Sequence, residues 1–236
     1  AERLDSLVGI FGIGMIPTGD KDPFALRRAA LGLLRIMVEN QRALDLQLLI
    51  NAATEGYGDT IAADTNKKVF NFVLQRLRGY YHEREVTPAV FDSVLSCRPT
   101  QPLDFDQRIA AVKDFVIREE SASLSAANKR IHNLLKKTDE PIPDSVDSSL
   151  FEEDAEKALA ADLDQIRQQL DDALAKDQYA TALEVLSTLR SPVDTFFEAV
   201  MVMSNNDAVR RNRLALLSQL RNQFLRIADI SLLHTS

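Results

Sequence analysis

The sequence lacks tryptophan entirely and contains one cysteine, eight glycines and eight prolines in 236 residues. Because Cys97 is the single thiol, no disulfide can form within the chain, and this usage is typical of cytoplasmic proteins. The scarcity of glycine and proline favours helices over turn-rich β structure. The chain has neither an apolar run long enough to cross a bilayer nor a signal-peptide pattern at its N-terminus. We therefore expect a cytoplasmic protein without a membrane partner.

Patterns that carry catalysis or bind metals are also missing. The three histidines, His82, His132 and His234, have no partner at metal-ligand spacing. Consecutive carboxylates such as Glu119 and Glu120 point to different sides of a helix and cannot converge on one substrate atom. The glycines among the first twenty residues fit neither a dinucleotide fingerprint nor a phosphate loop. We expect no catalysis, metal or cofactor in this chain on its own.

The formal net charge of −7 is unevenly distributed along the chain. Residues 138–177 contain thirteen acidic and three basic side chains, which leaves the rest of the chain at about +3. We interpret this acidic block as a solvated loop and helix face turned away from any nucleic acid. Since electrostatic attraction depends on the local distribution of charge, the negative total does not exclude an RNA partner.

Apolar residues recur at helical spacing through most of the chain, and no strand pattern with a period of two is present. The expected class is an all-α helical bundle. The first clear helix is expected from the Asp22 N-cap and Pro23 to about Thr54. Further helices are expected from Asp64 or Thr65 through Leu77, from Thr87 through Leu95, and over residues 104–119, 121–137, 150–176 and 178–189.

A proline-rich segment supplies the best candidate for a domain boundary. Pro99 and Pro102 enclose a threonine and a glutamine between two helical patterns. We therefore divide the chain into residues 1–98 and residues 99–236. Because the sequence begins Ala-Glu-Arg, we expect it to be a fragment of a longer protein.

Two amphipathic helices are expected in the last fifty residues. Ser191 is a suitable N-cap for the first, with Pro192 at its first helical position, where a missing N–H is harmless. The segment 204–207 interrupts the apolar pattern and offers an N-cap for the second helix. The apolar stripe of the first helix comprises Val193, Phe196, Phe197, Val200, Met201 and Met203.

Three arginines cluster in the first turn and a half of the last helix: Arg210, Arg211 and Arg213. Because a helix N-terminus carries partial positive charge, arginines there oppose the helix dipole. One interpretation is that they bind an anion, and a phosphate backbone is the obvious candidate. The other is that they pair with Asp207 or with carboxylates of a neighbouring helix. Spacing alone does not decide between the two.

A second basic cluster lies on the helix expected over residues 121–137. It consists of Lys129, Arg130, Lys136 and Lys137, and part of it can share one helix face. Asparagine side chains that can hydrogen-bond base edges accompany the basic clusters: Asn128, Asn133 and Asn212. Recognition of an RNA loop needs cations for phosphates together with hydrogen bonds or stacking to bases. Smaller basic patches are formed by Arg27 and Arg28, and by Arg76 and Arg78.

Several segments of the chain also resemble a known family. The C-terminal part is similar to the DALR-type anticodon-binding domain, and the chain more narrowly resembles the β subunit of bacterial glycyl-tRNA synthetases. The segments that carry this resemblance are Ile13–Gly14, Pro17–Gly19 and Lys21–Ala30, then Ala126–Ile131, and finally Leu189–Phe197, Val200–Met203 and Arg211–Leu217.

The resemblance implies a role within a larger enzyme. Residues 99–236 would be the anticodon-binding domain, and residues 1–98 a helical connector from the end of an HD-like domain. Glycine tRNA, the synthetase α subunit and the remainder of the β subunit would be the partners. ATP and Mg²⁺ would be held by the α subunit, with no cofactor in this chain. The β subunit would grip the tRNA, so that remote binding orients its acceptor end.

The basic clusters and their asparagines, taken together with the resemblance, predict which residues contact RNA. On this reading they are Asn128, Lys129, Arg130, Lys136, Lys137, Arg210, Arg211, Asn212 and Arg213. Removing the charges at 210, 211 and 213 is expected to weaken tRNA binding and to flatten its salt dependence. Two alternatives stay open. One is a non-catalytic helical scaffold for protein partners, and the other is an arginyl-type synthetase with the same anticodon-binding module.

Overall fold

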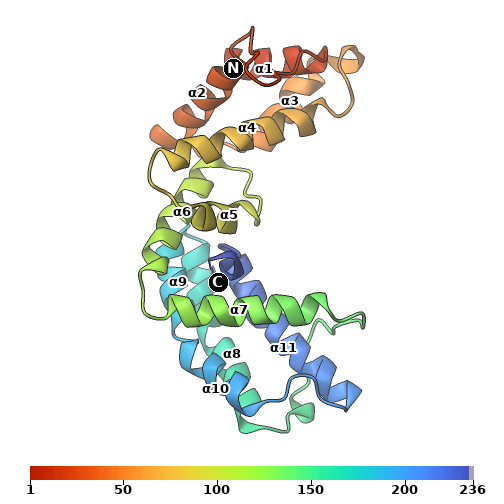
Figure 1. Cartoon of the computed structure of the whole chain (residues 1–236), viewed down its shortest axis with the longest axis vertical. Coiled ribbons are helices and arrows are strands. Elements are labelled where there is room, and N and C mark those ends of the chain that lie inside the picture. Colours follow the sequence, from red (N-terminus) through yellow and green to blue (C-terminus); the bar gives the residue numbers. More distant parts are fainter. Residues whose placement is uncertain (234–236) are drawn as a thin grey trace. The chain divides into compact units, whose positions relative to one another are not determined.

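A computed structural model describes residues 1–233 of the chain (Figure 1). Within these residues it contains eleven α-helices, three short 3₁₀ turns and no β-strand, which confirms the all-α class. The chain forms two compact units. Unit 1 comprises residues 1–91 and 98–106, and unit 2 comprises residues 92–97 and the chain from Gln107 onward. The expected boundary between residues 98 and 99 stays a prediction.

Unit 1 is built around α4, which contacts α1, α2 and α3 (Figure 1). The helices of unit 1 are α1 (Glu2–Gly12), α2 (Leu26–Glu39), α3 (Leu46–Glu55) and α4 (Thr65–His82), with the first part of α5 (Pro88–Leu95) and of α6 (Pro102–Val116). An aromatic cluster fills one end of the core, where the ring of Tyr81 stacks on Phe105 with centroids 5.5 Å apart. The Tyr81 hydroxyl donates a 2.8 Å hydrogen bond to Asp106, so its polar end is satisfied.

Two glycines of α1 allow close packing in unit 1. A Cβ added at Gly9 would lie 2.6 Å from the Tyr57 hydroxyl oxygen, and one added at Gly12 would lie 2.2 Å from Cγ2 of Ile61. Both distances are shorter than atoms in contact allow. Gly9 and Gly12 thus allow the segment after α3 to approach α1 closely.

The single helix expected from Asp22 to Thr54 is wrong in two respects. The chain leaves α2 after Glu39 and starts α3 at Leu46, with Asp45 as N-cap accepting a 2.9 Å hydrogen bond from the Leu48 N–H. The helix also starts later than expected, at Leu26. Asp22 nevertheless caps it from outside, because its two carboxylate oxygens accept hydrogen bonds from the N–H groups of the first two helical residues.

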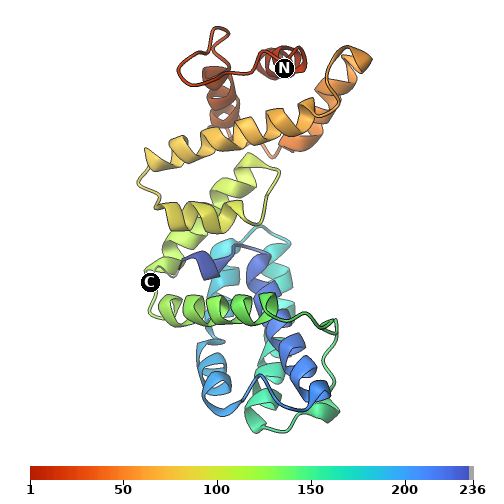
Figure 2. The ribbon, with the colours of Figure 1, turned by 45° about the vertical axis from the view of Figure 1, so that its right-hand side comes forward.

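Unit 2 is a bundle in which α7 packs across α10 and α11, and α8 packs against α9 and α10 (Figure 2). Its helices are α7 (Ser121–Lys136), α8 (Asp154–Leu174), α9 (Tyr179–Ser187), α10 (Arg190–Ala199) and α11 (Asp207–Leu225), with the last parts of α5 and α6. The 3₁₀ turn Ile230–Leu232 packs on α7. A hydrogen bond of 2.8 Å from the Asp229 N–H to the Ser93 carbonyl joins residues 92–97 to this end of the chain.

The expected start of α10 is wrong by two residues. The helix begins at Arg190 after Leu189, so that Ser191 and Pro192 lie within its first turn. The expected cap of α11 is confirmed, because Asn206 Oδ1 accepts hydrogen bonds from the N–H groups of Ala208 and Val209. The apolar stripe that was expected for α10, from Val193 to Met203, is only partly buried.

The chain leaves the helical path after α10. Val200 adopts an extended conformation, and from there alternate residues face inward. Val202 is therefore buried, whereas Met201 and Met203 are exposed to 76% and 50%. The expectation that both methionines belong to a buried helical stripe is wrong.

Cys97 follows α5 and belongs to unit 2. It is half-buried, and its Sγ lies 3.9 Å from the Ser93 carbonyl oxygen. Burial raises the pKa of the thiol, and hydrogen bonding from Ser96 and the charge of Arg108 lower it less. These contacts are those of a packed thiol.

Candidate nucleic-acid interface

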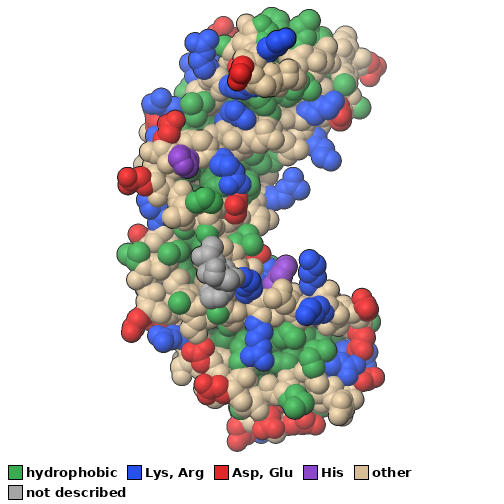
Figure 3. Space-filling view, viewed as in Figure 1, with side chains coloured by type: hydrophobic (Ala, Val, Ile, Leu, Met, Phe, Trp, Pro, Cys, Tyr) green, Lys and Arg blue, Asp and Glu red, His purple; other side chains and the backbone are tan. Residues whose placement is uncertain are grey.

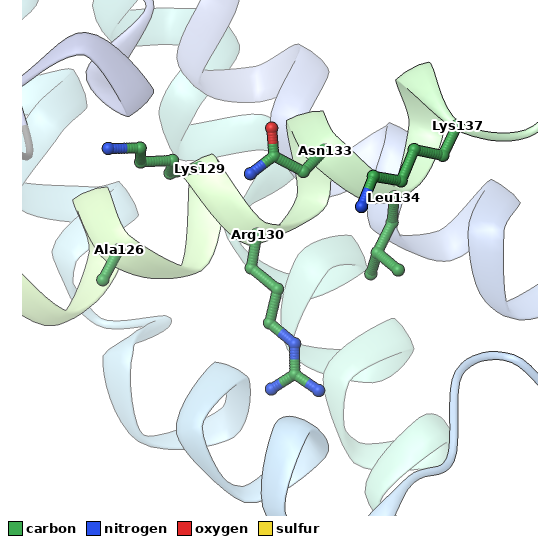
Figure 4. Close-up of a pocket in the computed structure, with 6 residues that line it drawn as sticks. All are labelled: Ala126, Lys129, Arg130, Asn133, Leu134 and Lys137. Atoms are coloured by element: carbon green, nitrogen blue, oxygen red, sulfur yellow. The ribbon is translucent and has the colours of Figure 1, made fainter.

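The outer face of α7 carries the main cationic surface of unit 2. Leu124, Ala127 and Ile131 of this helix point into the core, which leaves the opposite side in solvent. A shallow depression of about 350 Å³ lies along that side, and Figure 4 shows the six side chains that line it. They are Ala126, Lys129, Arg130, Asn133, Leu134 and Lys137. We call these residues together with Lys136 the α7 face.

Arg130 is held in place by an aromatic ring. Its guanidinium carbon lies 4.3 Å from the centre of the Phe197 ring, which belongs to α10. Such a cation–π contact orders the planar guanidinium without neutralising its charge. Figure 4 shows the Arg130 side chain leaving α7 on the side of this neighbouring helix. The result is a flat, cationic surface at the edge of the depression.

Charged and apolar side chains are mixed on this side of unit 2. Figure 3 shows lysine and arginine side chains along α7 and a hydrophobic patch beside them. His132, Asn133, Lys136 and Lys137 are exposed, and Lys129 is half-buried. Cations for phosphates, an amide for base edges and apolar surface for base faces are the components that RNA loop binding uses.

Asn128 does not belong to the α7 face. Only 1% of it is exposed, and its amide nitrogen donates a 3.0 Å hydrogen bond to the Leu124 carbonyl within the same helix. Its Oδ1 has no hydrogen-bond partner in the structure. Burial argues against direct contact of this side chain with RNA, so we do not include it in the proposed contact set.

Arg210 is occupied by internal ion pairs. Its guanidinium lies 2.7 Å from a Glu140 carboxylate oxygen and 3.0 Å from one of Asp207, and it also donates to the Ser204 carbonyl. These hydrogen bonds raise the pKa of Arg210 above its usual value. For Arg210, carboxylates of the protein therefore provide the anion that an arginine at the start of α11 requires.

Arg213 lies in the interior of unit 2, and its charge is neutralised more completely than that of Arg210. Its side chain is 4% exposed and contacts the fully buried carboxylate of Glu156 at 2.9 Å and that of Glu152 at 3.0 Å. Burial alone would raise the pKa of Glu156. The hydrogen bonds from Arg213 and from the backbone N–H groups of Glu153 and Glu152 outweigh burial and lower this pKa below its usual value. Arg213 is thus a structural residue that ties α11 to α8.

Asn212 also makes internal contacts. Its side-chain amide accepts a 2.8 Å hydrogen bond from the Asp147 N–H and donates one of 2.9 Å to the carbonyl of the same residue. This pair of bonds fixes the loop before α8 on the surface of α11. Arg211 is half-exposed, and its Nε donates to the Asp207 carbonyl one turn earlier. Of the four residues expected in this region, Arg211 alone stays available to a phosphate.

The acidic block is mostly exposed to solvent, as expected, but four of its carboxylates also pair with arginines of unit 2. Glu140, Glu152 and Glu156 pair with α11, and Asp171 pairs with Arg226 at 2.6 Å. These four carboxylates neutralise three arginines of unit 2, namely Arg210, Arg213 and Arg226. The opposing interpretation, in which the arginines pair with carboxylates of the chain, is correct for Arg210 and Arg213.

Phe197 belongs to the site because Arg130 lies over its ring, but the sequence pattern assigned it to the apolar stripe of α10. The signal that could have identified it is its position directly after Phe196, because consecutive helical residues point about 100° apart and cannot both be fully buried at a narrow interface. The structure buries Phe196 and leaves Phe197 half-exposed beneath Arg130.

A search of residues 1–233 finds no group of three or more histidine, cysteine or carboxylate side chains arranged to hold a metal ion. His234 lies outside the described residues. No helix in the described part of the chain is long and apolar enough to cross a membrane.

Residues 124–233 match the family model described as the DALR anticodon binding domain. This match runs from the first turn of α7 to the end of α11 and beyond, and it includes the whole α7 face. The class of protein is thus one that carries an anticodon-binding domain of the kind found in aminoacyl-tRNA synthetases.

The N-terminal part of the chain, which forms most of unit 1, narrows the class of protein further. Residues 1–96 match the model described as the glycyl-tRNA synthetase beta subunit, so this part of the chain is similar to that family. It is 52% identical over 234 residues to a glycine–tRNA ligase beta subunit from Pseudomonas aeruginosa strain LESB58. It is 50% identical over the same length to glycine–tRNA ligase beta subunits from Shewanella sp. strain MR-4 and Shewanella putrefaciens strain CN-32. These alignments cover 99% of the chain but only 34% of each relative.

Proposed function

We propose that this chain binds the anticodon end of glycine tRNA and so positions the tRNA for aminoacylation. The α7 face is the contact surface, with Lys129, Arg130, Lys136 and Lys137 as its cations. Residues 99–236 form the binding domain, and residues 1–98 form the connector from the end of an HD-like domain. The observation that carries the proposal is the contrast between the outward-facing cations of α7 and the neutralised arginines of α11.

The chemistry of the α7 face suits an RNA loop. Its lysines supply mobile point charges for phosphates, whereas the guanidinium of Arg130 on Phe197 supplies a plane on which an unstacked base can lie. Asn133 adds an amide donor and acceptor between them. Stacking of this kind contributes about 1–3 kcal/mol per base.

The wider role follows from the family. The α subunit of the synthetase would hold glycine, ATP and Mg²⁺ and perform the chemistry in the cytoplasm, and this chain would contribute no cofactor. Binding energy from the anticodon end would then orient the distant acceptor end. The remainder of the β subunit and the α subunit are the expected protein partners.

The test is a titration of the chain against glycine tRNA, an anticodon-swapped version and an unrelated tRNA at several salt concentrations. The double variant K136Q/K137Q should weaken binding and reduce the slope of log K against log salt by up to about 2, because each phosphate contact contributes roughly 0.9. We expect the native anticodon to be preferred.

A matched control removes the same charge elsewhere in unit 2. Lys157 and Arg167 are exposed on α8, where they pair with Asp154 and Asp164. The double variant K157Q/R167Q should leave the slope unchanged. If the two double variants behave alike, the α7 face is not the binding surface.

A second candidate is a scaffold for protein partners, and one observation favours it. In unit 1, Ile13, Met15 and Phe24 are exposed to 63%, 53% and 48%. Apolar docking through such residues would be insensitive to salt, whereas RNA binding falls steeply as salt is added. The same titration therefore distinguishes the two functions.

A further inference from the structure

Unit 1 contains a cationic groove of its own between α2 and α4. Arg27 and Arg28 of α2 and Arg76 of α4 line a depression of about 270 Å³. A second depression of about 370 Å³ shares Arg27 and Arg76 and adds Lys68. Because the two depressions have these arginines in common, they form one continuous surface, which we call the α2–α4 groove.

The cations of the groove are only partly balanced by carboxylates. Glu83 lines the first depression, and Asp64 pairs with Lys68 at 2.9 Å. The Asp22 carboxylate is engaged by the backbone at the start of α2, and the Arg27 guanidinium donates to the Gly19 carbonyl. Within residues 1–233, no carboxylate pairs with Arg28 or Arg76. The groove therefore keeps a net positive charge.

Arg76 carries the most specific signal. Its Nε is buried and has no hydrogen-bond partner, although the guanidinium carbon lies 5.3 Å from the centre of the Phe72 ring. A buried N–H without an acceptor costs about 1–3 kcal/mol, so native structures rarely leave one unsatisfied. Arg76 also lines both depressions, so an oxyanion bound there would lie beside its guanidinium and offset its unbalanced charge.

We propose that the α2–α4 groove binds phosphate oxygens of an RNA backbone, at a site separate from the α7 face. Its cations are distributed over two adjoining depressions, which suits several phosphates in sequence better than one small anion. Asn71 and Gln75 line the same surface and supply neutral donors, as sugar–phosphate contacts require. This inference depends on the proposed function in one respect: the RNA that the groove binds is taken to be tRNA.

The test uses the whole chain, glycine tRNA and the isolated anticodon stem-loop of that tRNA. The double variant R28Q/R76Q should lose about two phosphate contacts with the whole tRNA. When the salt concentration is raised from 50 to 200 mM, the variant should therefore lose about tenfold less affinity for tRNA than the unmodified chain does. Binding of the anticodon stem-loop should be unchanged. By contrast, K136Q/K137Q should weaken binding of both RNAs, so that each proposal can fail independently.

Two controls keep the result interpretable. The single variant R28Q changes an exposed side chain and should retain the fold and about half of the effect, even if loss of Arg76 destabilises unit 1. K157Q/R167Q removes the same charge from unit 2. An unchanged salt dependence in both R28Q and R28Q/R76Q, or an equal change in K157Q/R167Q, overturns the proposal. The first of these results would favour an acidic protein surface as the occupant.

Discussion

At the scale of single residues, burial distinguishes arginines that hold the fold from arginines that can meet a ligand. Arg210 and Arg211 are neighbours in the sequence, yet only Arg210 has carboxylate partners in the described structure. Arg213 is buried against two glutamates. We therefore expect the charge-removal experiment at 210, 211 and 213 to report mainly on stability, with Arg211 alone contributing to RNA binding.

The first stability prediction concerns Glu156. In the variant E156Q, Arg213 stays buried with a single remaining carboxylate, so the free energy of unfolding should fall by about 3–5 kcal/mol. Chemical denaturation followed by circular dichroism measures this. The matched variant is E152Q, which removes the other partner of Arg213. Because Glu152 is 54% exposed, its loss should cost under about 1 kcal/mol. Equal losses would contradict this assignment.

At the scale of helices, the sequence predicted most elements but misplaced their ends. Periodicity identified α4 to α9 because their apolar stripes are continuous. The helix starts expected from Asp22 and Ser191 were wrong, because these good capping residues lie near a helix start without being the N-cap. The backbone conformation at Ala25, whose φ is 55°, is a local feature that propensities do not reveal.

The close packing of α1 gives a second prediction. In G12A, the new methyl group would overlap Ile61, whose β-branched side chain cannot easily move aside, and the free energy of unfolding should fall by about 1–3 kcal/mol. Gly79 provides the control, since it lies in α4 with no atom within 4 Å of an added Cβ. The variant G79A should stabilise the protein by about 0.5–1 kcal/mol. Effects of the same sign in thermal unfolding would contradict the argument.

At the scale of the whole molecule, acid should destabilise unit 2. Glu156 and Asp229 both have a lowered pKa, although burial by itself would raise each. Asp229 is hydrogen-bonded by Arg221 at 2.6 and 3.0 Å and by Ser231. Carboxylates of this kind stabilise the folded state above their ordinary pKa values, near 4, and this contribution is lost as the pH falls below them.

The corresponding measurement is the free energy of unfolding between pH 7 and pH 3. We expect it to fall steeply below about pH 4.5 in the unmodified chain and less steeply in E156Q, where one titrating group has been removed. Parallel curves for the two proteins would show that the Glu156–Arg213 pair does not contribute to acid sensitivity.

The candidate site was only partly predictable from the sequence. The cations of α7 followed from their shared helix face, because solvent exposure on an amphipathic helix is a local property. The pairing of Arg213 with Glu156, residues 57 positions apart, depends on how α8 and α11 pack, which periodicity does not encode. For the same reason, Arg27 and Arg28 are predicted as one patch and Arg76 as part of another, and the packing of α2 on α4 joins them.

The single cysteine gives the protein an internal kinetic reporter. Only the thiolate attacks disulfide reagents, and the raised pKa of the half-buried Cys97 keeps little of it present at neutral pH. Its reaction rate in the folded protein should therefore rise whenever residues 92–97 separate from Asp229, whose N–H is bonded to the Ser93 carbonyl. Because the chain has no other thiol, this opening can be timed in the unmodified protein and compared before and after RNA is added.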